Sequence, residues 1–375
     1  MIEIKVANRC PDFKSYRAAR VKSMFNVDHA CNFDLTALLP ADDDTWQIGV
    51  IVGPSGSGKS SIGRNFWPGI PIANLALDWP TDQPIIDVIS PDKSFDQVTA
   101  AFVAVGLGSV PSWLRPFHVL SIGEQFRAGV ARIIADRPER VIIDEFTSAL
   151  DRRVALNGAR SFARAWRRDH GQCLILTCHR DILRSLQPDW IYDTATGEFS
   201  GRYLQCPKRI KVDVYKTNWS YWPLFEQHHY LRLHNMVAAK AYVGFVDGVP
   251  VCHAGVTTHL CGIKSLEARI ARVVVMPEWQ GLGIGHRFLN AIAAWNLQGS
   301  AEGRLPGRRL LSLLNTSHPG LARTLRGDPA WIQVSGTLHG SNRSRKLSNT
   351  SKPIGRGAEY GGHFRATQGF RYIGG

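Results

Sequence analysis

The sequence is short of three features: long uncharged runs, paired cysteines and, in its second half, acidic residues. The uncharged run from Thr99 to Leu114 is too short to span a bilayer and is interrupted by Gly106, Gly108 and Pro111. The first ten residues, MIEIKVANRC, lack the basic and then apolar pattern of a secretory signal. These absences argue against a membrane-spanning or secreted protein, and we expect a cytoplasmic one.

The cysteines also exclude a class of architecture. Seven are present, an odd number without a C-x-x-C pair, which argues against both a disulfide framework and a zinc site. Cys252, His253 and Cys261 are close enough in sequence to be considered as metal ligands, but scattered core or loop positions are the simpler interpretation. We therefore expect no structural metal. With 375 residues and 44% hydrophobic content, the chain is long enough for two domains with separate cores.

Acidic residues are scarce only after residue 201. Residues 1–201 carry 22 Lys and Arg against 23 Asp and Glu, whereas residues 202–375 carry 23 against 8, so the net charges are −1 and +15. A positive excess confined to one part of a chain favours a polyanionic partner, most often nucleic acid, bound in a salt-dependent way. The alternatives are a basic surface that serves solubility and one that binds a phosphorylated cofactor.

A phosphate-binding loop is present near the beginning of the chain. The segment WQIGVIVGPSGSGKSSIGRNF (46–66) combines an apolar strand, a G-x-x-x-x-G-K-S turn and the start of a helix. Glycines allow backbone N–H groups to point at a β-phosphate, Lys59 neutralises phosphate charge, and the hydroxyl of Ser60 is a ligand for Mg²⁺. The helix N-terminus adds its positive dipole end. Nucleotide binding follows from this pattern in this context.

A second apolar strand ends in two carboxylates. In RVIIDEFTSALD (140–151), Asp144 is placed to hold the metal ion through water, and Glu145 is placed to polarise an attacking water. Two acids at the end of a buried strand are costly unless they have a function. The segment therefore predicts nucleotide hydrolysis as well as binding.

The order of these and three further motifs resembles the ABC-type ATPases over residues 20–195. VLSIGEQFRAGVARIIA (119–135) resembles their signature sequence and its helix, SALD (148–151) their D-loop, and LILTCHR (174–180) the strand that ends at the switch histidine, His179. The resemblance implies a head-to-tail dimer in which Ser121 and Gly123 of one subunit close over ATP held by Lys59 of the other. It assigns ATP and Mg²⁺ contacts to Gly53, Ser55, Gly56, Gly58, Lys59, Ser60, Ser61, Gln83, Ser121, Gly123 and Asp144, with Ser60 and Asp144 toward the metal, and catalysis to Glu145 and His179.

The signature departs from the family pattern at two positions. Its first glycine is replaced by Ile122 and its terminal glutamine by Glu124. An additional side chain and an additional negative charge near the γ-phosphate would oppose tight closure. Since Glu145 and His179 are both present, we expect slow or regulated hydrolysis rather than an inactive site.

The second half of the chain contains another glycine-rich turn. A polar stretch at 196–212 precedes AYVGFVDGVPVCHAGVTT (241–258), in which Asp247-Gly248 predicts a hairpin, and EARIARVVVMPEWQGLGIGHRFLNAIAAW (267–295), which reads as strand, turn and amphipathic helix. The turn resembles the acyl-CoA motif of the GNAT superfamily of N-acetyltransferases, and the resemblance covers residues 215–335. It implies acyl-CoA contacts by Val273, Val274, Val275, Gln280, Gly281, Leu282, Gly283, Ile284, Gly285 and Asn315.

The proton-transfer groups for amine acylation are not fixed by the sequence. The family commonly supplies an acid from a tyrosine after the strand that holds Asn315, but no tyrosine lies between Ser312 and Trp331. Glu267, His228 and His229 are candidates for the base. For the histidines, a helix packed through Trp222, Phe225 and His229 is an equally good interpretation.

We therefore predict an α/β fold in which a P-loop ABC-type ATPase domain (1–201) and a linker (202–212) precede a mixed-sheet α+β GNAT acyltransferase domain (213–335). Residues 336–375 form a basic Gly/Ser/Arg-rich segment, either a surface loop with a closing strand or a nucleic-acid contact. The predicted function is ATP-dependent transfer of an acyl group, acetyl in the simplest case, from acetyl-CoA or another acyl-CoA to nucleic acid, DNA before tRNA, in a phage or bacterial modification system. The predicted assembly is a homodimer through the ATPase domains. Two alternatives are acylation of a small amine or protein with a regulatory ATPase, and a nucleic-acid clamp or ribosome-associated ATPase with a non-catalytic second domain.

Overall fold

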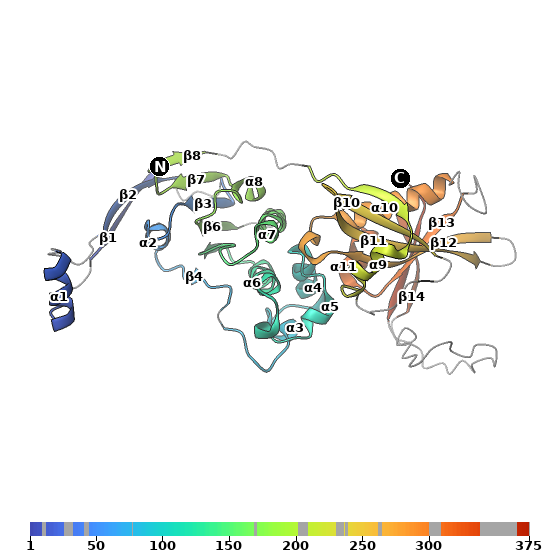
Figure 1. The fold of residues 1–375 in the computed structure, drawn as a ribbon, viewed down its shortest axis with the longest axis horizontal. Helices are drawn as coiled ribbons and strands as arrows, with labels where there is room; N and C mark the ends of the chain where they lie inside the picture. The colour runs from blue at the N-terminus through green and yellow to red at the C-terminus, as the bar shows by residue number, and fades with distance from the viewer. Residues whose placement is uncertain are drawn as a thin grey trace. The chain divides into compact units, whose positions relative to one another are not determined.

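A computed structural model describes residues 1–9, 13–25, 33–40, 45–76, 78–168, 171–201, 209–229, 236, 239–261, 265–299, 309–337 and 366–374 (Figure 1). The chain divides into two units. The first contains Met1–Ser90 and Pro116–Lys208, and the second contains Pro91–Arg115 and Arg209–Gly375. No helix in the described ranges is both long and apolar enough to cross a membrane.

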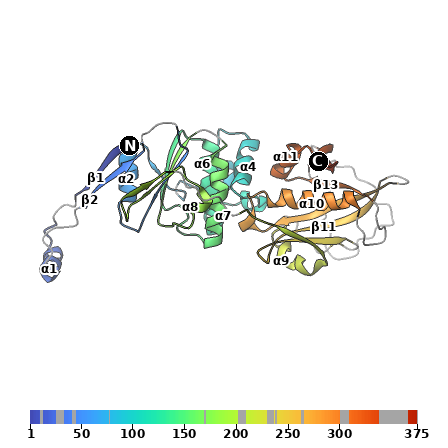
Figure 2. The same ribbon diagram turned by 90° about the horizontal axis from the view of Figure 1, so that it is seen from above.

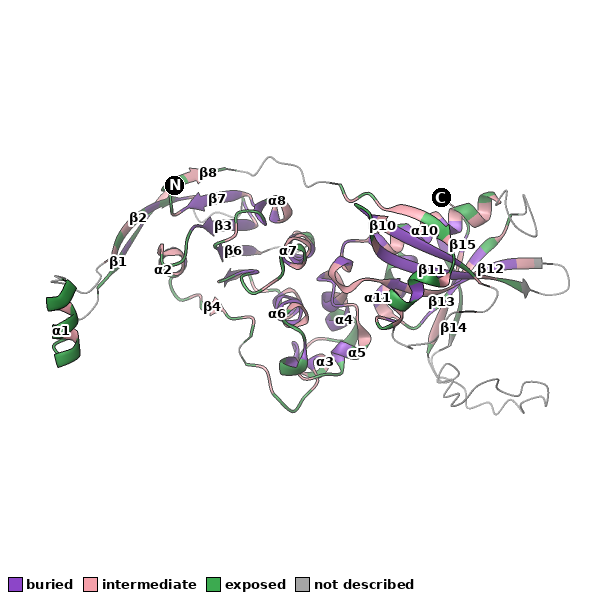
Figure 3. Cartoon of the chain, viewed as in Figure 1, coloured by how far each residue is buried: buried purple, intermediate pink, exposed green. Residues whose placement is uncertain are grey.

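The first unit is built on a six-stranded sheet in the order β4-β5-β6-β3-β7-β8. All neighbouring strands are parallel except β7 and β8. The strands are β3 (Ile48–Val52), β4 (Ile72–Ala73), β5 (Arg140–Ile143), β6 (Gln172–Thr177), β7 (Trp190–Asp193) and β8 (Glu198–Ser200). Every residue of β3 and β6 is buried, as expected for central parallel strands covered on both faces (Figure 3).

Helices and a short ribbon complete the first unit. The ribbon pairs β1 (Ile2–Asn8) with β2 (Phe33–Leu39) in antiparallel register. Buried aromatic rings pack beside β3, with Trp46 stacked on Trp67 and edge-on to Trp190. The helical elements are α1 (Tyr16–Phe25), α2 (Lys59–Phe66), α3 (Ile85–Val88), η1 (Phe117–Val119), α6 (Ile122–Asp136), α7 (Arg152–Trp166) and α8 (Leu183–Leu186).

The second unit is built on a seven-stranded mixed sheet in the order β14-β15-β13-β12-β11-β10-β9. Strands β9 to β12 pair antiparallel, β12 and β13 pair parallel, and β15 pairs antiparallel with both β13 and β14. The strands are β9 (Asp213–Thr217), β10 (Lys240–Val246), β11 (Val249–Cys261), β12 (Ser265–Val275), β13 (Leu311–Thr316), β14 (Trp331–Thr337) and β15 (Thr367–Tyr372).

Helices cover both faces of this sheet. Figure 2 shows α10 and α9 on opposite sides of it. Phe288 and Leu289 of α10 join a core with Cys252 and Ala254, whereas Trp222 and Phe225 of α9 pack with Val243 and Val274. The helical elements are α4 (Phe95–Ala104), α5 (Val110–Trp113), η2 (Trp219–Tyr221), α9 (Trp222–Glu226), η3 (Pro277–Trp279), α10 (Ile284–Gln298) and α11 (Pro319–Arg326).

The predicted α/β architecture with a mixed second sheet is confirmed, and one detail differs from expectation. Pro91–Arg115, which the sequence boundary placed in the first domain, packs in the second unit. The closing strand considered for the C-terminal segment is present as β15, and it lies between β13 and β14. The predicted hairpin is present, with Asp247 and Gly248 both at positive φ between β10 and β11. Residues 338–365, which hold most of the basic C-terminal segment, lie outside the described ranges.

A buried imidazole makes the second unit sensitive to acid. His253 of β11 is fully buried, with its ring centroid 5.0 Å from Trp222 and 5.5 Å from Phe225. This burial lowers the pKa of His253 from 6.5 to about 4. Between those values the unfolded chain binds the proton more readily than the folded chain, so stability falls as pH falls from 6.5 toward 4.

We expect this single group to cost roughly 3 kcal/mol of folding free energy by the acidic end of that range. The variant His253→Phe retains an aromatic ring among aromatic neighbours but has no group to protonate. Urea unfolding followed by tryptophan fluorescence between pH 4 and 7 should therefore give the variant a shallower pH dependence than the wild type. Parallel pH profiles for the two proteins would show that His253 is not the responsible group.

Candidate functional site

The nucleotide loop begins where the buried strand β3 ends. Gly53 donates its N–H to the carbonyl of Thr177 at 3.3 Å, which fixes the start of the loop to β6. A Cβ on Gly53 would lie 1.9 Å from the hydroxyl of Thr194, so the loop requires a residue without a side chain there. Gly56 and Gly58 have φ of 76° and 87°, a region that favours glycine. Because Gly58 is the N-cap of α2, the free N–H groups of the first helical turn open into this loop.

The residues beside the loop suit a magnesium nucleotide. Lys59 donates from Nζ to the carbonyl oxygens of Gly53 and Pro54 at 3.0 and 2.7 Å, so its ammonium lies over the loop. The Ser60 hydroxyl donates to a carboxylate oxygen of Asp144 at 2.5 Å. Two oxygen ligands held together at the end of a phosphate loop are the donor set that Mg²⁺ prefers. The residues present therefore fit the cofactor.

The chain turns sharply after Asp144. Glu145 has φ of 50° and Thr147 has φ of 65°, both unusual for residues with a Cβ. The backbone N–H of Glu145 donates to Asp144 Oδ1 at 2.8 Å, and the Glu145 side chain is exposed. Strained backbone of this kind is concentrated at functional sites. The turn leaves the Glu145 carboxylate in solvent, where it is accessible to an attacking water.

His179 is positioned by two polar contacts. Its backbone N–H donates to Thr177 Oγ1 at 3.1 Å, and its Nδ1 lies 3.1 Å from Nη1 of Arg152. Arg152 also forms an ion pair with Asp181. The sequence interpretation did not identify Arg152 as part of this site, although its position directly after the SALD motif was a usable signal.

The signature segment explains one of its departures from the family pattern. Ser121 is the N-cap of α6, and Glu124 completes a capping box by accepting from the Ser121 N–H at 2.9 Å and from its hydroxyl at 2.7 Å. The Glu124 carboxylate is thus directed back to the helix end. Ile122 is 59% exposed, and a Cβ on Gly123 would make only ordinary contacts. Gln83 is exposed in the turn before α3.

The second glycine turn joins β12 to α10. Gln280 donates from Nε2 to the Val275 carbonyl at 3.0 Å, which ties the turn to the end of the strand. Gly281 and Gly283 have φ of 78° and 74°, and Gly283 is the N-cap of α10. A Cβ on Gly285 would lie 3.0 Å from the Val275 side chain. A helix N-terminus approached by a glycine turn presents backbone N–H groups to an anion, so the residues fit the pyrophosphate of an acyl-CoA.

The strand before this turn, β12, is paired with β13 along only part of its length. The register between β12 and β13 runs from Glu267↔Leu311 to Ile270↔Leu314, and Val273–Val275 lies beyond it. Asn315 pairs instead with Gly369 of β15. On the other side of β12 the register with β11 shifts between His253 and Gly255. Leu282 and Ile284 are buried in the core, so within the turn they have a packing role.

The three candidates for the acyl-transfer base lie in different surroundings. Glu267 is nearly buried and accepts from Nη2 of Arg371 at 2.9 Å. It precedes Val273 by six residues on the same strand, about 20 Å in an extended chain. His229 is buried edge-on against the Trp222 ring, with centroids 5.7 Å apart.

His228 is half-buried at the end of α9 and lies within the electrostatic influence of Glu278, a residue of the turn η3 before Gln280. Burial lowers the pKa of His228, and the charge of Glu278 opposes that effect. A neutral imidazole at neutral pH is suited to accept a proton. Glu278 was not identified from the sequence.

Comparisons with known proteins give one match to a family model and a separate set of similar proteins. Residues 211–304 match the family model of the acetyltransferase (GNAT) family. An uncharacterised ABC transporter ATP-binding protein of Synechocystis is 30% identical over 176 residues, which cover 40% of this chain and 26% of that protein. A putative ABC transporter ATP-binding protein of Methanothermobacter marburgensis is 35% identical over 109 residues, 28% of this chain and 37% of that protein.

A solved dimeric bacterial ABC transporter cassette matches 43% of this chain and 87% of its own length, with 16% identity and a TM-score of 0.35. The chain thus spans well under half the length of the two curated relatives named above. Residues 211–304 thus match the acetyltransferase (GNAT) family, and the N-terminal part of the chain is similar to ATP-binding proteins of ABC transporters, which is consistent with an ABC-type ATPase joined to a GNAT domain.

Proposed function

We propose that this chain is an ATP-dependent N-acyltransferase that acts on an amino group of nucleic acid, DNA in preference to tRNA, as part of a phage or bacterial base-modification system. The observation that carries the proposal is the presence of two phosphate-binding glycine turns in one chain, each at the N-terminus of a helix. The first is accompanied by the Ser60–Asp144 pair, and the second by a half-buried neutral histidine.

In the acyltransferase domain, each step is assigned to groups of this chain. Acyl-CoA supplies the activated thioester when bound. The N–H groups at the start of α10 hold its pyrophosphate, and Val273–Val275, which lies beyond the register with β13, offers a backbone N–H to the thioester carbonyl. His228 accepts the proton that the attacking amine loses. Asn315, which follows the last residue of β13 that pairs with β12, would complete the acyl-CoA contacts.

In the ATPase domain, Lys59 and the α2 N-terminus hold the phosphates, Ser60 and Asp144 hold Mg²⁺, and Glu145 orients the attacking water. Arg152 positions the ring of His179, which would contact the γ-phosphate of bound ATP. The ATPase domains would form a dimer in which Ser121 of one subunit closes over the ATP of the other. This closure would couple ATP binding and hydrolysis to the handling of the nucleic-acid substrate.

The nucleic-acid substrate is supported by charge. The net charge of +15 over residues 202–375 belongs to the part of the chain that holds the acyltransferase. A surface of this sign binds polyanions with strong salt dependence. Extruding a base from a duplex costs a few kcal/mol, which ATP-driven closure is able to supply.

The deciding experiment measures acetyl transfer from radiolabelled acetyl-CoA to DNA, tRNA and simple polyamines, with and without ATP, for the wild type, Lys59→Ala and Gly283→Trp. We expect DNA to be labelled by the wild type with ATP only, and by neither variant, because one lacks the phosphate-neutralising charge and the other fills the CoA turn. Equal labelling of polyamines with and without ATP would contradict both the coupling and the substrate. If the wild type and Gly283→Trp both label none of the three substrates, the second domain would be a binding module without acyltransferase activity.

A further inference from the structure

One segment of the chain belongs to the ATPase by sequence and to the acyltransferase by packing. Pro91–Arg115 lies between the nucleotide loop and the signature Ser121, yet it is part of the second unit. It carries α4 and α5, and the chain leaves the first unit at Ser90 and returns to it at Pro116. Its position raises the question of what it does for the acyltransferase.

Hydrogen bonds and packed aromatic rings hold the segment together internally. Ser94 caps α4 in a capping box with Gln97, and Gly106 ends the helix with φ of 86°. The Trp113 ring stacks on Phe102 and donates from Nε1 to the Leu107 carbonyl at 2.7 Å. Both rings are almost fully buried. The loop between α4 and α5 is therefore held in one shape.

That loop is bonded to the acyl-CoA turn through Gly108. The Gly108 N–H donates to Oε1 of Gln280 at 2.9 Å, and Nε2 of His318 donates to the Gly108 carbonyl at 3.0 Å. Nδ1 of His318 accepts from the Leu321 N–H at 3.2 Å, which places the ring proton on Nε2. Burial lowers the pKa of His318, so the neutral form is favoured. A single residue, Gly108, thus joins the CoA turn to the N-cap of α11.

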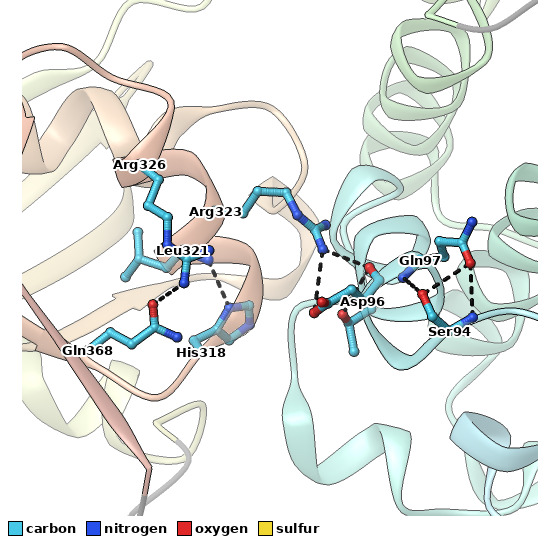
Figure 4. Close-up of polar contacts among 9 residues, drawn as sticks. Ser94, Asp96, Gln97, His318, Leu321, Arg323, Arg326 and Gln368 are labelled. Carbon is cyan, nitrogen blue, oxygen red and sulfur yellow. Dashed lines mark hydrogen bonds and ion pairs between the residues drawn. The ribbon is translucent and has the colours of Figure 1, made fainter. Parts of the chain in front are cut away.

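The backbone of the α4–α5 loop lies too close to the acyl-CoA turn for side chains to fit between them. A Cβ on Gly106 would lie 2.6 Å from the Gln280 carbonyl oxygen, and one on Gly108 would lie 2.8 Å from Gln280 Oε1. A Cβ on Gly320 of α11 would lie 2.5 Å from Val103. At the rim, Arg323 donates to the carbonyl of Asp96 at 2.7 Å (Figure 4). The contact is therefore continuous from α4 to the CoA turn.

Gln280 occupies the middle of a hydrogen-bonded chain. Its Nε2 donates to the Val275 carbonyl, at the end of the strand that faces the thioester in the proposed reaction, while its Oε1 accepts from Gly108. A side-chain amide fixed at both ends cannot rotate freely, so the backbone of the following turn is held as well. Gly108 therefore acts on the turn through Gln280.

The residues of the first unit that flank this segment in sequence are hydrogen-bonded to the signature helix α6. On the entry side, the Ser90 hydroxyl donates to the carboxylate of Asp136, the last residue of α6. On the return side, Nε2 of Gln125 in α6 donates to the carbonyls of Phe117 and Leu120 at 3.3 and 3.1 Å. A shift of α6 when its N-cap Ser121 engages a nucleotide would therefore move the residues to which Pro91–Arg115 is joined along the chain on each side.

We propose that Gly108 and His318 are positioning residues for acyl-CoA binding, and that Pro91–Arg115 transmits the nucleotide state of the signature helix to Gln280. The inference rests on the proposed function, because it assumes that the turn at Gln280 binds acyl-CoA. It goes further by naming the segment through which ATP acts on the acyltransferase and the atoms at which it acts.

The test compares acetyl-CoA affinity by calorimetry with and without a non-hydrolysable ATP analogue. In the wild type we expect the analogue to change the Kd of acetyl-CoA by about fivefold or more, and acetyl-CoA to change the Kd of the analogue by the same factor. In Gly108→Ala the new methyl displaces Gln280, so acetyl-CoA binding should weaken by about fivefold and the effect of the analogue should fall below about twofold.

Two further variants serve as controls. Gly327→Ala adds the same methyl near the end of α11, where the nearest atom would be 3.6 Å away, and should behave as the wild type. His318→Asn can still cap α11 but cannot reach Gly108, so it should reproduce Gly108→Ala and exclude a folding artefact. Acetyl-CoA binding that ignores the analogue, or Gly108→Ala and His318→Asn proteins that bind as the wild type does, would overturn this inference alone. A wild type that binds no acetyl-CoA would overturn the proposed function with it.

Discussion

Replacing Glu145 with Gln is expected to lower the rate of ATP hydrolysis by about a hundredfold or more. The amide keeps the shape of the carboxylate but cannot polarise water, whereas Lys59, Ser60 and Asp144, which we propose hold the phosphates and Mg²⁺, are unchanged. Because the Glu145 side chain is exposed and the strain of its turn lies in the backbone, the substitution should not disturb folding. The Kd of ATP should stay within a few-fold of the wild-type value.

The measurement is phosphate release at saturating ATP, with ATP affinity determined separately. Glu198→Gln removes an equally exposed carboxylate from β8 of the same unit and should leave turnover unchanged. Turnover in Glu145→Gln within about threefold of the wild type would assign the water-orienting role to another group. Loss of ATP binding in this variant would instead show that Glu145 supports the loop rather than the chemistry.

The strand, turn and helix around the nucleotide loop were predictable because their residues are local in sequence. A strand, a glycine turn and a helix follow one another at 48–66, so the geometry around Lys59 is encoded in one uninterrupted stretch. The position of Asp144 was predicted because it directly follows an apolar strand in the sequence. The role of Glu124 was not predicted. A glutamate at this position could either cap the helix or lie beside the phosphate, and the sequence does not show in which direction its side chain points.

The packing of Pro91–Arg115 was beyond sequence reasoning for a physical reason. Gly106 and Gly108 look like ordinary loop glycines, and their close contacts are made with Gln280, more than 170 residues away. The apolar face of α4 predicts burial but does not name its partner. The same limit applies to Glu267, whose ion pair with Arg371 depends on β15 inserting between β13 and β14.

His228→Gln is expected to lower kcat for acyl transfer by about a hundredfold while leaving acetyl-CoA affinity unchanged. The glutamine occupies similar space but cannot accept the amine proton. His228 is preferred over the other candidates because it is half-buried beside Glu278, whereas Glu267 is held by Arg371 and His229 packs on Trp222. If this assignment is right, Glu267→Gln should retain most of the wild-type rate.

The pH dependence of acyl transfer provides a second, independent test of His228 as the base. Because burial lowers the pKa of His228 below its ordinary value of 6.5, the base is deprotonated at neutral pH. For the wild type, kcat/KM should rise with pH through an apparent pKa below 6.5 and then level off, since the residue must be unprotonated to act. In His228→Gln that acidic limb should disappear along with the rate. If His228→Gln keeps the acidic limb of the pH profile, His228 is not the base. If Glu267→Gln loses the acyl-transfer rate instead, the base is Glu267 on strand β12.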